Sequence, residues 1–149
     1  MNEENALEIY RKIRSRNIFG KDLKPFLEML KYFTNKSEYA EDEIFGWEKV
    51  VQVNLSDAEN FYVKTDNPLG EHPKLVIEYG NAESPDTIVN TDKDSFTGIM
   101  CGRVFLPSDP PRVFEVKGDT TQSMIFFTLL MLIGQEFWEQ ERQTKTKKN

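Results

Sequence analysis

The spacing of apolar positions changes along the chain, and this change predicts where helices give way to strands. Residues 3–16 predict an amphipathic helix, because four apolar side chains recur at the spacing of one helical face: Ala6, Ile9, Tyr10 and Ile13. Residues 22–33 predict a second helix, with Asp22 as its N-cap and Pro25 in the first turn, where proline is tolerated. Residues 34–43 are expected to form a polar linker.

From Trp47 onward the apolar spacing is two, which is typical of strands with one buried face. Five strands are predicted, over residues 47–55, 61–64, 74–79, 86–91 and 113–117. A short helix over 92–101 separates the last two strands, and a capping-box-like pair, Asp119 and Gln122, begins a final helix over about 120–142. The order ααββββαβα predicts an α+β fold, in which helices cover a five-stranded, mostly antiparallel sheet.

Residues 124–133 are apolar on every side of the predicted final helix, with Thr128 as the one polar exception. The run has ten residues, well short of the roughly 18 to 20 that a helix needs to cross a bilayer. One sheet face cannot cover its whole circumference. Either the N-terminal helices bury the second side, or part of this surface lines a ligand cavity, where flexible Met and flat Phe side chains adapt to varied lipids.

Several short motifs follow one another in a characteristic order. Residues 85–88 are Pro-Asp-Thr-Ile, the helix that carries Phe96 ends in Cys-Gly-Arg at 101–103, and residues 113–119 are Val-Phe-Glu-Val-Lys-Gly-Asp. This order resembles the sterol carrier protein 2 family, whose small domains are also called nonspecific lipid-transfer proteins. The resemblance covers roughly residues 47–133.

The resemblance implies an apolar tunnel between the sheet and its helices that holds sterols, fatty acyl chains or acyl-CoA, and it implies no catalytic residues. Residues 1–149 are then a single domain with an N-terminal helical extension over about 1–43. Phe137 and Trp138 would either pack or mediate a dimer contact, or form a lid or a membrane-facing edge. The tunnel is expected to be lined by six apolar side chains: Phe96, Ile99, Met100, Met124, Phe127 and Met131.

The amino-acid composition argues against several kinds of binding and catalytic site. The net charge of -6 argues against sequence-independent binding of nucleic acid, which needs a basic surface. The single Cys101 and single His72 exclude an internal disulfide, a zinc site of Cys and His pairs and most nucleophile-histidine machinery. Asp92 and Asp94 are expected as helix caps, Cys101 as an inert thiol and His72 as an exposed loop residue. We therefore expect no enzyme activity, no cofactor and no metal site.

The lone thiol and the acidic start, which lacks the pattern of a secretion signal, predict a cytoplasmic location. The polar, basic residues 144–149 are expected to fray. A group of basic side chains forms either a solvated face or a surface for transient contact with anionic membranes: Arg11, Lys12, Arg14, Arg16, Lys21 and Lys24.

The leading hypothesis is non-catalytic binding or transfer of a lipid or other hydrophobic ligand, of the sterol, fatty acid or acyl-CoA class, in the apolar tunnel. The alternative is a protein-interaction or dimerisation module with the same fold and a filled core. Exposed apolar residues around Phe137 and Trp138 would favour the alternative, including a homodimer.

Overall fold

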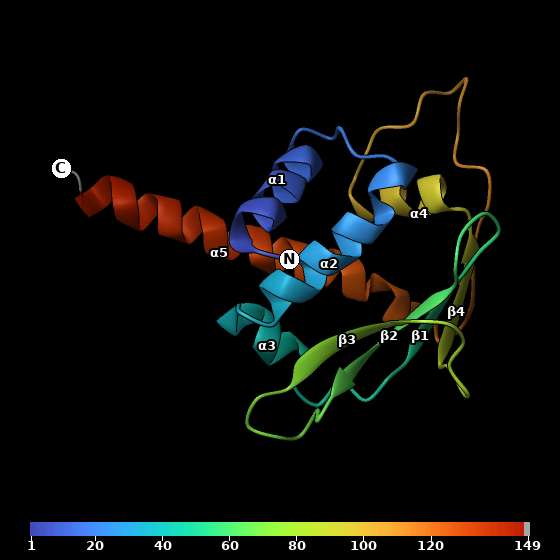
Figure 1. Cartoon of the computed structure of the whole chain (residues 1–149), viewed down its shortest axis with the longest axis horizontal. Helices are drawn as coiled ribbons and strands as arrows, with labels where there is room; N and C mark the ends of the chain where they lie inside the picture. The colour runs from blue at the N-terminus through green and yellow to red at the C-terminus, as the bar shows by residue number, and fades with distance from the viewer. Residues whose placement is uncertain (148–149) are drawn as a thin grey trace.

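Five strands form one mixed sheet in the order β3-β2-β1-β4-β5 in the computed structural model, which describes residues 1–147 (Figure 1). Three strand pairs are antiparallel, and β1 pairs with β4 in parallel. The α+β class and the mostly antiparallel sheet predicted from the sequence are confirmed. Along the chain the elements are α1 (Glu3–Arg14), η1 (Gly20–Asp22), α2 (Leu23–Thr34), α3 (Glu38–Ile44), β1 (Val51–Leu55), β2 (Phe61–Asp66), β3 (Lys74–Tyr79), β4 (Thr87–Thr91), α4 (Lys93–Met100), β5 (Phe114–Gly118), η2 (Thr120–Met124) and α5 (Ile125–Lys147).

The helices gather on one side of the sheet, and the core fills the space between the two layers (Figure 1). Three fully buried rings lie at its centre: Phe61 of β2, Phe96 of α4 and Phe126 of α5. Their centroids are 5.1 to 6.5 Å apart and the rings meet edge to face. Each such pair adds about 0.5–1.5 kcal/mol to the burial of its rings. This aromatic cluster joins the sheet to two helices.

Side-chain caps explain where three of the helices begin. The hydroxyl of Ser37 accepts a hydrogen bond from the backbone N–H of Ala40 at 3.2 Å and starts α3. The carboxylate of Asp92 accepts from the N–H of Ser95 at 2.9 Å and starts α4, as predicted. Asn2 caps α1 in the same way. A cap of this kind stabilises a helix by about 1 kcal/mol, because it satisfies an N–H that has no partner within the helix.

Two predictions about the first half of the chain were wrong. The polar linker predicted over 34–43 contains α3, because Ala40 and Ile44 of this short helix are buried in the core. The first strand begins at Val51 instead of residue 47, because the N–H of Val50 donates to the carboxylate of Asp86 at 2.8 Å and not to a neighbouring strand.

The predicted helix starts at Asp22 and Asp119 also need correction. The carboxylate of Asp22 accepts from the N–H of Phe19 at 2.9 Å, so it closes the 3-10 turn η1 and makes no side-chain cap on α2. The carboxylate of Asp119 accepts from the side chain of Gln122 at 3.1 Å, and the segment begins as the 3-10 turn η2. Helix α5 continues to residue 147, so the predicted frayed tail is helical there, and residues 148–149 lie outside the described residues.

Candidate functional site

One face of α5, together with the end of η2, is apolar and exposed to solvent. Met124, Met131 and Trp138 follow one another at intervals of seven residues, which places them on the same side of the helix. Their exposed fractions are 51%, 66% and 55%. Phe127 lies on the same side between the two methionines and is half-buried. We call these four side chains the apolar face of α5.

The opposite side of α5 packs into the core, where Ile125, Phe126, Leu129 and Ile133 are buried. The helix is therefore apolar on two sides, and the rest of the described chain covers one of them. Figure 1 shows that the C-terminal turns of α5 project beyond the other helices. Exposed apolar side chains that gather on one side of a helix make that side a candidate for contact with a ligand or another surface.

Phe137 and Trp138 are neighbours in the sequence, but their surroundings differ. The ring of Phe137 contacts Tyr10 of α1, with centroids 4.8 Å apart, and Phe33 of α2, with centroids 5.0 Å apart. The indole of Trp138 has the guanidinium of Arg142 at 4.8 Å from its ring centroid and is otherwise largely exposed. Phe137 thus has the packing role that the sequence left open, and Trp138 belongs to the surface.

Helix α1 approaches α5 closely at Gly134. A Cβ atom at this position would lie 3.0 Å from the hydroxyl of Tyr10, a spacing that few side chains tolerate. Burial in this contact raises the pKa of Tyr10 above its ordinary value. The N-terminal helices therefore cover part of α5, as one of the two explanations for its apolar circumference required.

The six residues predicted to line a tunnel divide between the core and the surface. Phe96 and Met100 of α4 are buried in the core, and Ile99 beside them is half-buried. The other three lie on the apolar face of α5: Met124, Phe127 and Met131. The α4 residues thus lie in or at the edge of the core, and the three residues on the apolar face of α5 are exposed or half-buried. Their contact with a ligand stays a prediction.

Three pockets of the described surface have other linings. One of about 430 Å³ lies between Met1 and the outer side of α2. A second, of about 250 Å³, lies between Asp92 at the start of α4 and residues 105–112. A third, of about 110 Å³, lies between Phe33 and Phe137. None of these three pockets is lined by any of the six predicted residues.

Asp94 lies in the first turn of α4, as predicted, but it does not cap the helix, because its carboxylate pairs with Arg103 over distances of 2.6 and 2.9 Å. It also accepts from the N–H of Gly20 at 2.7 Å. The guanidinium lies between the rings of Phe19 and Phe105, 4.8 and 4.6 Å from their centroids. Arg103 lowers the pKa of the Asp94 carboxyl below its ordinary value. The sequence signal was an arginine just after the glycine that ends the helix, with an aromatic residue two positions on.

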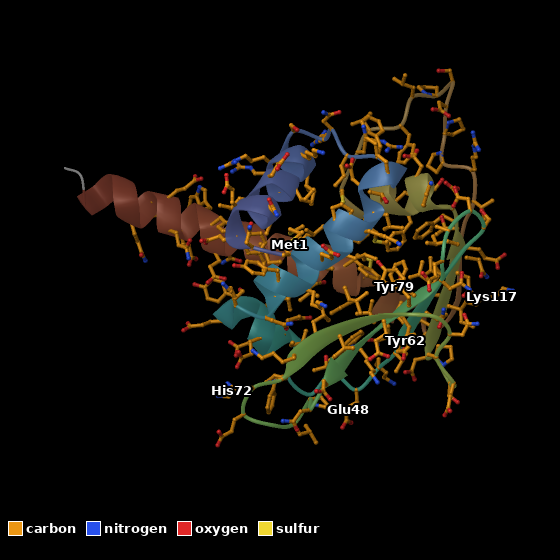
Figure 2. All side chains as sticks on the ribbon, in the orientation of Figure 1. Met1, Glu48, Tyr62, His72, Tyr79 and Lys117 are labelled. Atoms are coloured by element: carbon orange, nitrogen blue, oxygen red, sulfur yellow. The ribbon has the colours of Figure 1, made fainter. Side chains whose placement is uncertain are left out.

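The remaining reactive groups are placed as expected. Burial raises the pKa of the Cys101 thiol to about 12, and the nearby Arg103 opposes this only in part. His72 is exposed in the turn between β2 and β3 (Figure 2).

Within residues 1–147, no group of three or more His, Cys, Asp or Glu side chains is arranged to hold a metal ion. No helix in this part of the chain is long and apolar enough to cross a membrane.

No protein-family model matches the chain, and no curated protein matches its sequence. A crystal structure of sterol carrier protein 2 resembles it. The two chains are 16% identical, their TM-score is 0.40, and the match covers 73% of this chain and 91% of that one. At this level the likeness concerns the arrangement of helices and strands alone and carries no conclusion about a ligand.

Proposed function

We propose that this protein is a non-catalytic binding domain for a hydrophobic ligand of the lipid class, such as a fatty acyl chain. The ligand contacts the apolar face of α5. One observation carries the proposal: Met124, Met131 and Trp138 lie on one side of a helix with half or more of each side chain in water. Covering such surface is favourable because water is a poor solvent for it, and methionine adapts to ligands of different shape.

The size of this surface limits the affinity. Full burial of one such side chain contributes about 1.5–3 kcal/mol, so three that are already half covered contribute roughly 2–5 kcal/mol before the cost of ordering the ligand. A dissociation constant of 1 mM corresponds to about 4 kcal/mol. A ligand that binds more tightly must therefore also reach half-buried side chains such as Phe127 and Leu132. A long flexible chain can do so more readily than a compact molecule.

Displacement of a fluorescent fatty acid tests the proposal directly. Met131→Lys places a charge at the centre of the apolar face and is expected to weaken binding on the order of tenfold, since the loss of about 1.4 kcal/mol has that effect. Gln143→Lys is the matched control, because it adds the same charge at an exposed polar position of the same helix. Mass spectrometry of a solvent extract of the purified protein shows whether a lipid is carried. No extracted lipid and no displacement at protein concentrations up to about 1 mM would refute the proposal.

A second candidate is a protein-interaction module that uses the same face. The aromatic cluster of Phe61, Phe96 and Phe126 supports it, because these three buried rings pack against one another between the sheet and the helices, as expected for a filled core. Size-exclusion chromatography with light scattering on wild type and Trp138→Ala separates the two. Self-association that Trp138→Ala abolishes, without fatty-acid displacement, supports this second candidate.

A further inference from the structure

The two edges of the sheet differ in how much of their backbone is occupied. At the β3 edge, the side chain of Asn35 accepts from the N–H of Leu75 at 2.8 Å and donates to its carbonyl at 3.3 Å. Such a cover hinders the addition of another strand. At the β5 edge, no hydrogen bond within residues 1–147 joins the strand to anything but its neighbour β4 and groups on the β4 side. Lys117 lies at this side of the sheet in Figure 2.

The bonds at the two ends of β5 show which backbone groups are free. The N–H of Asp119 donates to the carbonyl of Asp86, and the carbonyl of Val113 accepts from the hydroxyl of Thr91. Odd-numbered residues of this segment therefore direct their backbone groups toward β4. Because these groups alternate along an antiparallel strand, the even-numbered residues direct theirs to the open edge. They are Phe114, Val116 and Gly118.

We propose that β5 pairs antiparallel with β5 of a second copy of this chain, around a two-fold axis at Val116. In this register the free N–H and carbonyl groups of the two strands bond to each other. Glu115 of each copy then lies directly opposite Lys117 of the other copy. Phe114 lies opposite Gly118 of the other copy, which has no side chain to obstruct the ring. The contact is isologous, as in most symmetric dimers.

The charges of Glu115 and Lys117 favour this register over the two adjacent registers. Pairs must join even-numbered residues to even-numbered ones, so the axis can move only in steps of one residue along the strand. An axis at position 115 would set Glu115 against Glu115 of the other copy, and an axis at position 117 would set lysine against lysine. Directly opposite like charges destabilise a strand pair, and unlike charges stabilise it. The axis at Val116 is the arrangement among these three that places unlike charges opposite.

The charges are available for this contact. The side chains of Glu115 and Lys117 are more than half exposed, and within one chain the ammonium nitrogen of Lys117 lies 3.3 Å from a carboxylate oxygen of Glu115. Asn90 and Lys117 lower the pKa of Glu115, which keeps its carboxylate ionised. On the outer face of the joined sheet, two carboxylates and two ammonium groups would alternate. The axis stands perpendicular to the sheet, so the helices of both copies cover the same side of a continuous ten-stranded sheet.

Sedimentation velocity on the full chain, from about 1 μM to about 1 mM, tests the proposal over the range of weak association. The expected mass at high concentration is twice the 17.4 kDa of one chain. Glu115→Lys and Lys117→Glu are each expected to reduce association at least tenfold, because each sets like charges opposite one another twice. The double variant with both changes restores unlike pairs and is expected to associate as the wild type does.

A second variant acts through the backbone. Val116→Pro removes an N–H that faces the open edge and leaves the groups that face β4, so it is expected to abolish association. Circular dichroism checks that each variant is folded. A wild type that stays monomeric at all concentrations would overturn the proposal, and so would single charge variants that associate as wild type. Fatty-acid displacement is expected to be unchanged in Glu115→Lys, which separates this contact from the proposed function of α5.

Discussion

Replacing Arg103 with alanine is expected to destabilise the fold strongly, because one guanidinium joins three parts of the chain. It pairs with Asp94 of α4, donates to the carbonyl of Ile18 at 2.8 Å and stacks between Phe19 and Phe105. Its side chain is 11% exposed. The substitution removes all of these contacts at once while leaving the helix cap at the start of α4 in place.

The expected loss is about 3 kcal/mol, which follows from three contributions. Hydrogen bonds to a charged group contribute about 1.5–3 kcal/mol each when shielded. Because the Asp94 side chain is 49% exposed, water replaces part of this pair, and about 1.5 kcal/mol is the appropriate value for the pair as a whole. Stacking on the two rings adds about 0.5–1 kcal/mol. The carbonyl of Ile18, a fully buried residue, loses a partner at a cost of about 1 kcal/mol.

Urea unfolding followed by circular dichroism measures this loss as a lower free energy of unfolding at an unchanged slope. Lys49→Ala is the control, because Lys49 pairs with Asp86 at 3.9 Å while its own side chain is 47% exposed, and it should cost less than about 1 kcal/mol. The lowered pKa of Asp94 contributes stability above the ordinary value of 3.8 that is lost as the pH falls toward the lowered value. The difference in the free energy of unfolding between wild type and Arg103→Ala should therefore become smaller in acid. A loss below about 1 kcal/mol at neutral pH would refute this reasoning.

Three further predictions concern the core and one turn. Cys101 is expected to react with a thiol reagent at mildly alkaline pH far more slowly in the native than in the urea-unfolded protein, because burial raises its pKa to about 12; equal rates would show an accessible thiol. Phe126→Ala is expected to lower the free energy of unfolding by about 3–5 kcal/mol, and Met131→Ala by less than about 0.5 kcal/mol; similar losses in urea unfolding would place Met131 in the core. Gly118→Ala should cost about 1–3 kcal/mol, since φ is +83° there and a Cβ would lie 2.4 Å from the carbonyl oxygen of Asp86; an unchanged melting temperature would contradict this.

The strands and the longer helices could be predicted because each has enough residues to show its own period. Helix α3 was missed because its seven residues include only two buried apolar positions, Ala40 and Ile44, among mostly acidic side chains. The available signal was local: Ser37 as an N-cap, with Glu38 and Glu41 in the first turn, where acidic residues are favoured. A pattern of apolar spacing that is assessed over a long window does not detect such a short helix.

The sequence identified α5 as apolar all round, but it could not show which side the protein covers. Nothing in the spacing distinguishes Met131 from Phe126. The difference arises from how α5 docks on the other elements, since Phe126 packs against Phe61 of β2 and Phe96 of α4, and Phe137 packs against Tyr10 and Phe33. Asp94 and Arg103 are close in sequence, but the groups that surround their pair, from Ile18 to Gly20, come from a distant segment. Contacts between elements far apart in sequence were thus the part that periodicity could not supply.

The central position of α5 in the core has a consequence for synthesis on the ribosome. Phe126 packs against Phe61 of β2 and Phe96 of α4, yet it is translated after every strand of the described chain. Since chains grow at about 5–20 residues per second, Phe61 and Phe96 lack this aromatic partner for a time on the order of seconds. A nascent chain stalled at Asp119 should therefore bind a hydrophobic dye that the released chain does not. Chaperones that recognise exposed apolar surface would bind the chain at this stage.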